Sequence, residues 1–185
     1  MGFVPGNKTS DAHLIIHNLV RKQCHNRGKW LYSCFIDFSK AFDTIPRETL
    51  LQKLLSFGID GNFFNMIRNI YTNDKICIKH EDKMRDPMHV NLGVEQGCIL
   101  SPLLFNIFLA DLPQRLDNDI QYLKPNLEYP SSIFWADDIV LFSESEKGLQ
   151  KMLMTMEKYC DENELTLNTD KTKCMIFNKT GRLLM

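Results

Sequence analysis

Short runs of apolar, β-branched and aromatic residues alternate along this chain with longer stretches in which apolar residues recur every three or four positions. The short runs are typical of buried strands, and the longer stretches are typical of amphipathic helices. The pattern predicts strands at 30–37, 132–136, 139–143 and 173–177, with helices at 9–26, 102–116 and 145–163. After the first strand it also predicts an inserted helix pair, 47–57 and 61–71, and a hairpin between 75 and 92.

Without the insertion, the order of elements is strand, helix, strand, strand, helix, strand, which is the βαββαβ plan of a ferredoxin-like fold. We therefore predict an α+β domain in which the sheet carries helices packed on one face. In the usual form of this plan the first strand lies beside the hairpin of 132–143. Acidic residues at the ends of these strands are then expected to meet at one edge of the sheet.

Two adjacent aspartates, Asp137 and Asp138, separate the two apolar runs of that hairpin. One interpretation is a polar turn, because Asp is a favoured turn residue. The other is a cation site, because neighbouring carboxylates repel unless a cation lies between them and a further ligand. Asp37, which ends the strand 30–37, is the candidate for that ligand. Three carboxylates form a hard-oxygen donor set suited to Mg²⁺.

Four segments resemble motifs A to D of the non-LTR retrotransposon (LINE-type) reverse transcriptases. They read FIDFSKAFDTIP at 35–46, GVEQGCILSPLLFN at 93–106, FWADD at 134–138 and LTLNTDKTK at 165–173. A further segment, GFVPG at 2–6, resembles the one that precedes motif A in that family. Each motif is weak by itself, whereas four of them in the family's order and at plausible spacings are highly specific.

The resemblance implies the palm of an RNA-directed DNA polymerase, a nucleotidyltransferase that joins a dNTP to a primer 3′-hydroxyl on an RNA template. Two Mg²⁺ ions, or Mn²⁺ as an alternative, would be held by Asp37, Asp137 and Asp138, and would activate the hydroxyl and stabilise the leaving pyrophosphate. Lys171 of motif D is implied to donate a proton to the pyrophosphate or to neutralise it, with Lys173 as the alternative. The expected partners are an RNA template, a DNA primer and dNTPs.

The resemblance also implies positions that contact the nucleotide or the template–primer: Phe38, Phe42, Gln96, Gly97 and Trp135. Phe42 corresponds to the steric gate that excludes a 2′-hydroxyl, although the residues alone favour a core aromatic. Gly97 would let the backbone approach a ligand, or would form an ordinary turn. Trp135 stands where the family has Tyr or Phe.

Composition narrows the function classes further. A net charge of −1 argues against a free-standing nucleic-acid-binding domain, but not against a palm whose acids hold metal. Val4 and Glu95 stand where basic residues are common in the family, which predicts weaker binding of a polyanion. Six scattered cysteines without a C-x-x-C pair indicate reduced thiols, and hence an intracellular location in the nucleus or cytoplasm. No apolar run is long enough to span a membrane.

The motif order predicts one partial reverse transcriptase domain over residues 1–185, comprising the end of the fingers and the palm. The remaining fingers, the thumb and any endonuclease would belong to a longer polyprotein and are expected partners. Two other hypotheses stay open at this point. One is a catalytically inactive, truncated or domesticated palm that acts as a structural or interaction module, and the other is a nucleotide cyclase. The complete set of Asp37, Asp137 and Asp138 favours the polymerase, whereas Val4 and Trp135 favour the inactive palm.

Overall fold

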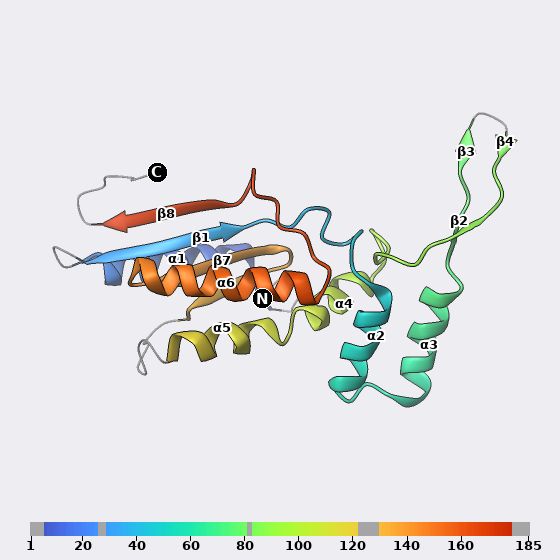
Figure 1. The fold of residues 1–185 in the computed structure, drawn as a ribbon, viewed down its shortest axis with the longest axis horizontal. Coiled ribbons are helices and arrows are strands. Elements are labelled where there is room, and N and C mark those ends of the chain that lie inside the picture. The colour runs from blue at the N-terminus through green and yellow to red at the C-terminus, as the bar shows by residue number, and fades with distance from the viewer. Residues whose placement is uncertain (1–5, 26–28, 81–82, 122–129, 179–185) are drawn as a thin grey trace. The chain divides into compact units, whose positions relative to one another are not determined.

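A computed structural model describes residues 6–25, 29–80, 83–121 and 130–178 of the chain (Figure 1). The chain divides into two compact units. One comprises residues 1–41 and 109–185 and is called the sheet unit; the other comprises residues 42–108 and is called the 42–108 unit. Each unit contains buried hydrophobic side chains of its own. No helix in the described ranges is sufficiently long and apolar to cross a membrane.

The sheet unit is built on four antiparallel strands in the order β6-β7-β1-β8. Their bounds are β1 Trp30–Ile36, β6 Ser132–Trp135, β7 Asp138–Ser143 and β8 Lys173–Asn178. The first strand in the chain lies between the hairpin β6–β7 and the last strand, which is the arrangement of the βαββαβ plan. The predicted fold class is therefore confirmed, and each predicted strand is present within one or two residues of its expected ends.

One face of this sheet is covered by α1, Thr9–Gln23. Ala12 and Leu19 of the helix form a buried cluster with Leu31, Val140 and Phe142 of the strands, among others. Trp135 and Phe35 pack against the edge of the same cluster. The apolar residues on one side of the helix therefore pack against strand residues that alternate in sequence and point to one face of the sheet.

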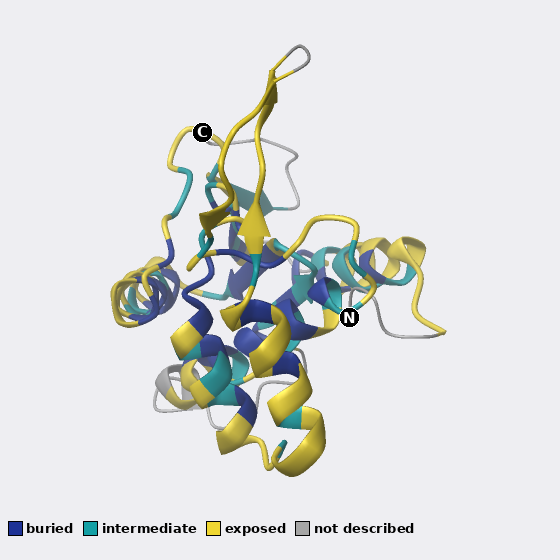
Figure 2. Ribbon diagram, turned by 90° about the vertical axis from the view of Figure 1, so that its right-hand side faces the viewer, coloured by how far each residue is buried: buried dark blue, intermediate teal, exposed yellow. Residues whose placement is uncertain are grey.

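The opposite face is covered by α6, Glu146–Glu162, which contacts β7 and β1. Figures 1 and 2 show α6 and α1 on opposite sides of the strands. This agrees with the prediction for the βαββαβ plan, whose last helix is α6, whereas α1 precedes the plan and covers the other face. Cover on both faces is needed by β7, where four consecutive apolar residues, 139–142, are all buried. Successive side chains point to opposite faces, so a continuous apolar run needs cover on both sides.

The predicted helix 102–116 is divided into α4, Ser101–Phe108, and α5, Leu112–Gln121. Pro113 is the second residue of α5, where its missing N–H leaves no helical hydrogen bond unmade. Within the sheet unit α5 packs on α6, and the Tyr159 hydroxyl donates a 2.8 Å hydrogen bond to Asp111 at this contact. The division at 109–111 coincides with the boundary between the two units.

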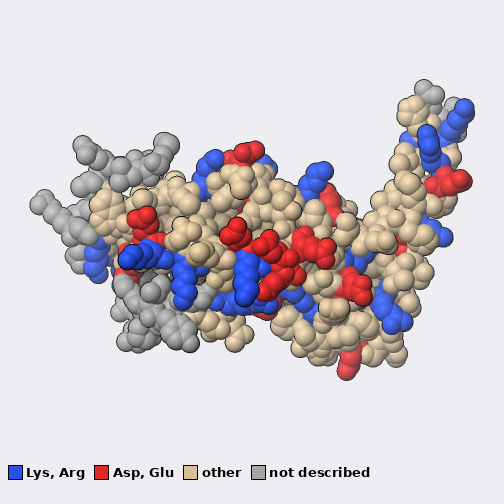
Figure 3. All heavy atoms as spheres, viewed as in Figure 1, with Lys and Arg blue, Asp and Glu red and all other residues tan. Residues whose placement is uncertain are grey.

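The 42–108 unit contains α2, Arg47–Ser56, and α3, Gly61–Thr72, which form the predicted helix pair. α2 packs against both α3 and α4. The predicted hairpin is present as two short ladders, β2 (Lys75–Ile76) with β5 (Met88–His89) and β3 (Lys79–His80) with β4 (Lys83–Met84). Its described residues are largely exposed (Figure 2), and Lys and Arg side chains gather on it (Figure 3).

Candidate functional site

The strand register brings Asp37 and Asp138 to the same end of the sheet. Ile36 of β1 pairs with Ile139 of β7. Asp37 and Asp138 are the next residues beyond that pair, and directly opposite residues place their side chains on the same face. Two carboxylates that are 101 positions apart in the sequence are thus neighbours in the fold.

Asp137 occupies the turn that joins β6 to β7. Trp135 and Asp138 are the last paired residues of the hairpin, so Ala136 and Asp137 form a two-residue turn. Ala136 has a φ of 57°, in the left-handed region that residues with a Cβ seldom adopt. Ala136 is therefore strained in the same turn that holds Asp137, and such strained residues are common at functional sites.

The three carboxylates influence one another electrostatically. The pKa of Asp138 is raised above its usual range, first by partial burial and then by the negative charges of Asp137 and Asp37. In Asp37, the Oδ2 atom is buried and has no hydrogen-bond partner among the described residues. Such an atom is costly unless a cation or a donor approaches it.

These observations test whether the residues suit a divalent cation. The donor atoms are hard carboxylate oxygens, and a cation between them would relieve the mutual repulsion and would bind Oδ2 of Asp37, which accepts no hydrogen bond from the described residues. In the described ranges no three Asp, Glu, His or Cys side chains already form a group that could ligate one ion. The residues fit the cation in chemical type and placement, and their side chains would have to turn toward it.

Lys171, the predicted site residue of motif D, lies near the acids. Its Nζ atom is 3.8 Å from Oδ2 of Asp37, and its side chain is 71% exposed. An exposed pair at this distance contributes little stability. The ammonium group therefore keeps the freedom to leave Asp37 for another anion.

The loop before β8 holds the backbone of Asp37 from both sides. The Asp37 N–H donates to Oγ1 of Thr172 at 3.2 Å, and the Asp37 carbonyl accepts from the N–H of Asn168 at 2.8 Å. Asn168 also accepts the N–H of Lys171 through its side chain, at 3.2 Å. Motif D therefore positions the first carboxylate as well as carrying Lys171.

Two predicted nucleotide-binding aromatics of the sheet unit are less open than expected. Phe38 is 5% exposed and forms a β-bridge with Leu167, so its ring is buried and its backbone lies against the motif D loop. Trp135 is half-buried and packs against the α1 cluster, next to Asp138 in the hairpin. The indole is thus anchored in the core, and only part of it remains accessible.

The 42–108 unit contains the other predicted binding residues, and motif B is tied to the end of motif A within it. Gly93 N–H donates to the Ile45 carbonyl and Val94 N–H donates to the Phe42 carbonyl, both at 2.8 Å. Gly93 has a φ of 80°, and a Cβ placed on it would lie 2.7 Å from the Asp43 carbonyl oxygen. Only glycine allows this close approach of two backbones.

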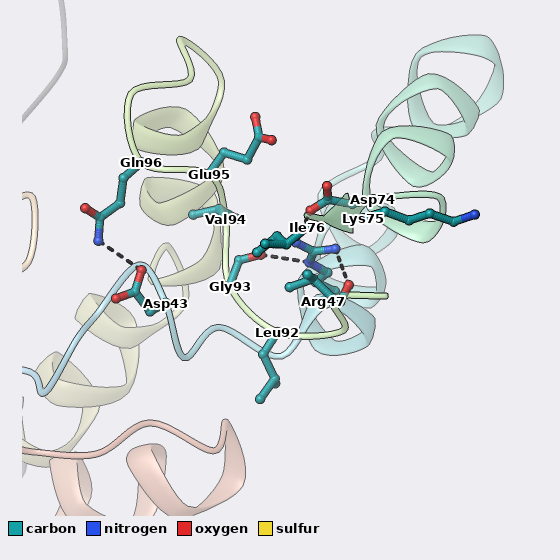
Figure 4. Close-up of a pocket in the computed structure, with 11 residues that line it drawn as sticks. Asp43, Arg47, Asp74, Lys75, Ile76, Leu92, Gly93, Val94, Glu95 and Gln96 are labelled. Carbon is teal, nitrogen blue, oxygen red and sulfur yellow. Dashed lines mark hydrogen bonds and ion pairs between the residues drawn. The ribbon is translucent and has the colours of Figure 1, made fainter. Parts of the chain in front are cut away.

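Gln96 lies along a cavity of about 770 Å³ whose lining includes Asp43, Arg47, Lys75 and Glu95 (Figure 4). The Gln96 amide Nε2 donates a 2.9 Å hydrogen bond to Oδ1 of Asp43. In Figure 4 the amide oxygen of Gln96 points away from Asp43. This oxygen is therefore available as an acceptor, while the adjacent Gly97, with a φ of 90°, is exposed.

Arg47 holds the wall of this cavity together. Its guanidinium donates to the carbonyl oxygens of Gly93 and Tyr71, each at 2.8 Å, and to that of Val90. It also pairs with Asp74 at 2.7 Å, and its side chain is only 8% exposed. One buried cation thus fixes α2, the end of α3 and the strand that leads into motif B.

Phe42, the predicted steric gate, is half-buried and stacks on Phe105 of α4. The ring centroids are 4.8 Å apart and the planes are 23° from parallel. One face of the ring is therefore fixed by a buried aromatic residue. This arrangement satisfies the core-aromatic interpretation and would also hold the ring in place as a gate.

Sequence reasoning missed the roles of Arg47, Asn168 and Thr172. A signal was available for Arg47, which occupies the first position of a helix. The positive helix end disfavours a cation there, so an arginine at that position indicates another binding partner. Asn168 and Thr172 gave no comparable signal, because polar residues are ordinary in a loop.

The family model described as reverse transcriptase (RNA-dependent DNA polymerase) matches residues 1–184. The chain belongs to the reverse transcriptase family. Relatives from retrotransposons agree with this assignment. The Pol polyprotein of retrotransposable element R2DM from Drosophila melanogaster is 30% identical over 92% of the chain. That of element R2 from Popillia japonica is 32% identical over 78% of the chain. The probable RNA-directed DNA polymerase from transposon BS of D. melanogaster is 26% identical over 92%.

This reverse transcriptase chain spans 16%, 24% and 19% of the lengths of those three relatives. Solved telomerases share its fold. Apo telomerase from Candida tropicalis superposes with a TM-score of 0.72 at 16% identity, over 92% of this chain and 35% of its own. Telomerase from Candida albicans, solved with a fragment of telomeric RNA, gives 0.70 at 14% identity, over 94% and 32%.

The predicted resemblance to a non-LTR reverse transcriptase is thus confirmed. Reverse transcriptases generally use divalent metal ions, which agrees with the donor set of the three aspartates. Most of the GFVPG segment lies outside the described residues. The predicted extent of the domain, and the roles of the individual site residues, stay predictions.

Proposed function

We propose that this chain is an RNA-directed DNA polymerase domain that adds dNTPs to the 3′-hydroxyl of a primer paired with an RNA template. The observation that carries the proposal is the convergence of Asp37, Asp137 and Asp138 at one end of the sheet. Asp37 reaches that end directly after β1, whereas Asp137 and Asp138 reach it from the β6–β7 hairpin. The family match supports the same chemistry.

In this proposal Asp37, Asp137 and Asp138 hold two Mg²⁺ ions, with Mn²⁺ as an alternative. When bound, such ions lower the pKa of the primer hydroxyl and stabilise the charge of the transferring phosphoryl group. The turn at Ala136 and the hydrogen bonds from Thr172 and Asn168 hold the carboxylates ready for this task. Lys171 leaves Asp37 to neutralise or protonate the departing pyrophosphate.

Phe42, Gln96 and Gly97 are proposed to contact the incoming nucleotide and the template–primer, together with Phe38 and Trp135. The stacked ring of Phe42 would exclude a 2′-hydroxyl by contact with the sugar. The outward amide oxygen of Gln96 would accept a hydrogen bond from the ligand. The RNA template, the DNA primer and the other regions of a longer polyprotein are the proposed partners, and an intracellular location stays a prediction.

The test is primer extension by the full chain on a primed RNA template with dNTPs and Mg²⁺. Asp137→Ala should reduce extension by at least about a hundredfold, because the site loses a ligand charge that acts in the transition state. The matched control is Asp161→Ala, an exposed acid on α6, which should retain wild-type activity. Circular dichroism would verify that all three proteins fold.

Two outcomes would overturn the proposal. The first is the absence of extension by folded wild-type protein over a range of Mg²⁺ and Mn²⁺ concentrations. The second is extension that survives Asp137→Ala, which would assign the activity to a contaminating polymerase. Omission of the RNA template separates this activity from template-independent addition, and ribonucleotide incorporation by Phe42→Val tests the sugar gate.

A further inference from the structure

Cys34 and Cys174 are direct partners in the antiparallel ladder of β1 and β8. Directly opposite residues project from the same face of a sheet. Their Cα atoms are typically about 4.5–5.5 Å apart, which lies within the range of about 4.4–6.8 Å found in disulfides. Cys174 also contributes to the raised pKa of Cys34, which agrees with their pairing in the ladder. The pair therefore already has the backbone placement that a disulfide needs.

The two thiols differ in access to solvent. Both are free, and Cys34 is 1% exposed whereas Cys174 is exposed on the outer strand of the sheet. Among the strands that the structure describes, no other two cysteines are register partners. An oxidant in solution can therefore reach the Cys174 thiol first, and the buried Cys34 thiol can then form the disulfide with it.

We infer that Cys34 and Cys174 are a redox modification site that closes to a disulfide when the chain meets a small disulfide oxidant such as oxidised glutathione. The Cys174 thiolate attacks one sulfur of the oxidant, forms a mixed disulfide and releases one glutathione thiolate. The Cys34 thiolate then attacks Sγ of Cys174 and expels the second glutathione. Two protein thiols are oxidised, the oxidant is reduced to two glutathione molecules, and these take up the two thiol protons.

The order of the two steps follows from the environment of each thiol. Burial is the main cause that raises the pKa of Cys34 to about 12, and the neighbouring Cys174 adds to it. A thiol with this pKa is rarely ionised at neutral pH, so Cys34 is a poor first nucleophile. Once Cys174 carries glutathione, the attack is intramolecular, and the fixed proximity of the two sulfurs compensates for the small thiolate fraction.

The bond would join β1, the strand that leads to Asp37, to β8, the strand that follows the motif D loop. Cys34 lies three residues before Asp37, and Cys174 lies three residues after Lys171. In the loop before β8, Asn168 and Thr172 hydrogen-bond to the backbone of Asp37. Oxidation would therefore fasten the motif D loop to the strand that carries the first carboxylate. This inference does not depend on polymerase activity.

The test uses the reduced full chain under native conditions. After incubation with oxidised glutathione, remaining thiols are blocked with N-ethylmaleimide, and the digest is analysed by mass spectrometry without reduction. We expect a linked pair of peptides containing Cys34 and Cys174, at least tenfold more abundant than any other linked pair. In urea the preference should disappear, and dithiothreitol should remove the link.

Variants separate the steps. Cys34→Ala should stop at the glutathione adduct on Cys174, and Cys174→Ser should leave Cys34 unmodified, because it is buried. Cys77→Ser, which removes another exposed thiol, should not change the yield of the link. Wild-type protein that retains the Cys174 adduct as long as Cys34→Ala does would overturn the inference. The inference would also be overturned if the native chain formed the Cys34–Cys174 link with no more preference over other cysteine pairs than the chain in urea.

Discussion

At the scale of single residues, the two positive-φ glycines of motif B make different demands. Gly93 has the Asp43 carbonyl oxygen 2.7 Å from the place of a Cβ, whereas Gly97 has open space around it. Gly97→Ala should therefore cost only the backbone strain, about 1 kcal/mol of unfolding free energy. Gly93→Ala adds a collision with backbone and should cost about 2–4 kcal/mol. Urea unfolding measures both, and equal losses would contradict the close approach.

Charge repulsion among the aspartates gives a second prediction at this scale. Asp138→Asn removes one of three carboxylates whose charges disfavour one another. In EDTA the variant should unfold at a slightly higher temperature than the wild type. Its free energy of unfolding should exceed the wild-type value by no more than about 1 kcal/mol, because most of Asp138 is exposed to solvent, which screens its charge. Added Mg²⁺ should stabilise the wild type more than the variant. Thermal unfolding with and without Mg²⁺ tests this, and an equal response to Mg²⁺ would argue against a cation site.

The hydrogen bond from the Asp37 N–H to Oγ1 of Thr172 can be tested by removing that oxygen atom. Thr172→Val keeps the shape of the side chain but removes the acceptor of the Asp37 N–H. We expect a loss of about 1 kcal/mol in stability and lower primer extension, because the first carboxylate is less firmly positioned. Thr166→Val is the control, because Thr166 is exposed and its interaction with the described residues is through its backbone carbonyl, which accepts from the N–H of Ser39. Wild-type extension by Thr172→Val would show that this bond does not position the site.

Among the elements, α2 depends on its first residue to connect it with α3 and motif B. Arg47→Met would leave Asp74 and three backbone carbonyls without their donor. Loss of one partner from a buried ion pair typically costs about 3–5 kcal/mol, and we expect this range for unfolding of the 42–108 unit. Arg47→Lys should be intermediate, because one ammonium cannot replace the planar fork.

Arg68→Met on the exposed side of α3 is the control for that experiment. It should change stability by no more than about 0.5 kcal/mol. Limited proteolysis adds a local readout, since Arg47→Met should speed cleavage near 90–96 more than elsewhere. A variant that unfolds and is cleaved like the wild type would mean that the carbonyls find other donors.

For the whole molecule, a net charge of −1 limits the attraction to nucleic acid. We expect the chain in EDTA to bind primed RNA with a Kd of about 1 μM or weaker at physiological salt, and more weakly as salt rises. Mg²⁺ should raise the affinity by neutralising the aspartates, and Asp37→Asn with Asp137→Asn should raise it in EDTA. Fluorescence anisotropy measures these changes, and tight binding that is insensitive to salt would contradict the electrostatic argument.

Several features of the fold were accessible from local patterns alone. The periodicity of β1, β6, β7 and β8 identified the strands, and their order in the chain identified the βαββαβ plan. Local patterns were less informative where one hydrophobic pattern is compatible with two different structures. The apolar run 102–116 is compatible with one helix or two. The four buried apolar residues of β7 indicate cover on both faces, but they do not say that α1 supplies the second cover.

The sequence by itself determined the elements, the fold class and the identity of the candidate carboxylates, because these depend on residue type, period and order. Only the tertiary structure decided that Asp37 lies opposite Asp138, that Asn168 and Thr172 hold its backbone, and that Arg47 is a buried hub. The same is true of the pairing of Cys34 with Cys174. Each of these contacts joins residues far apart in the chain, and strand register and side-chain direction, which no local pattern records, bring them together.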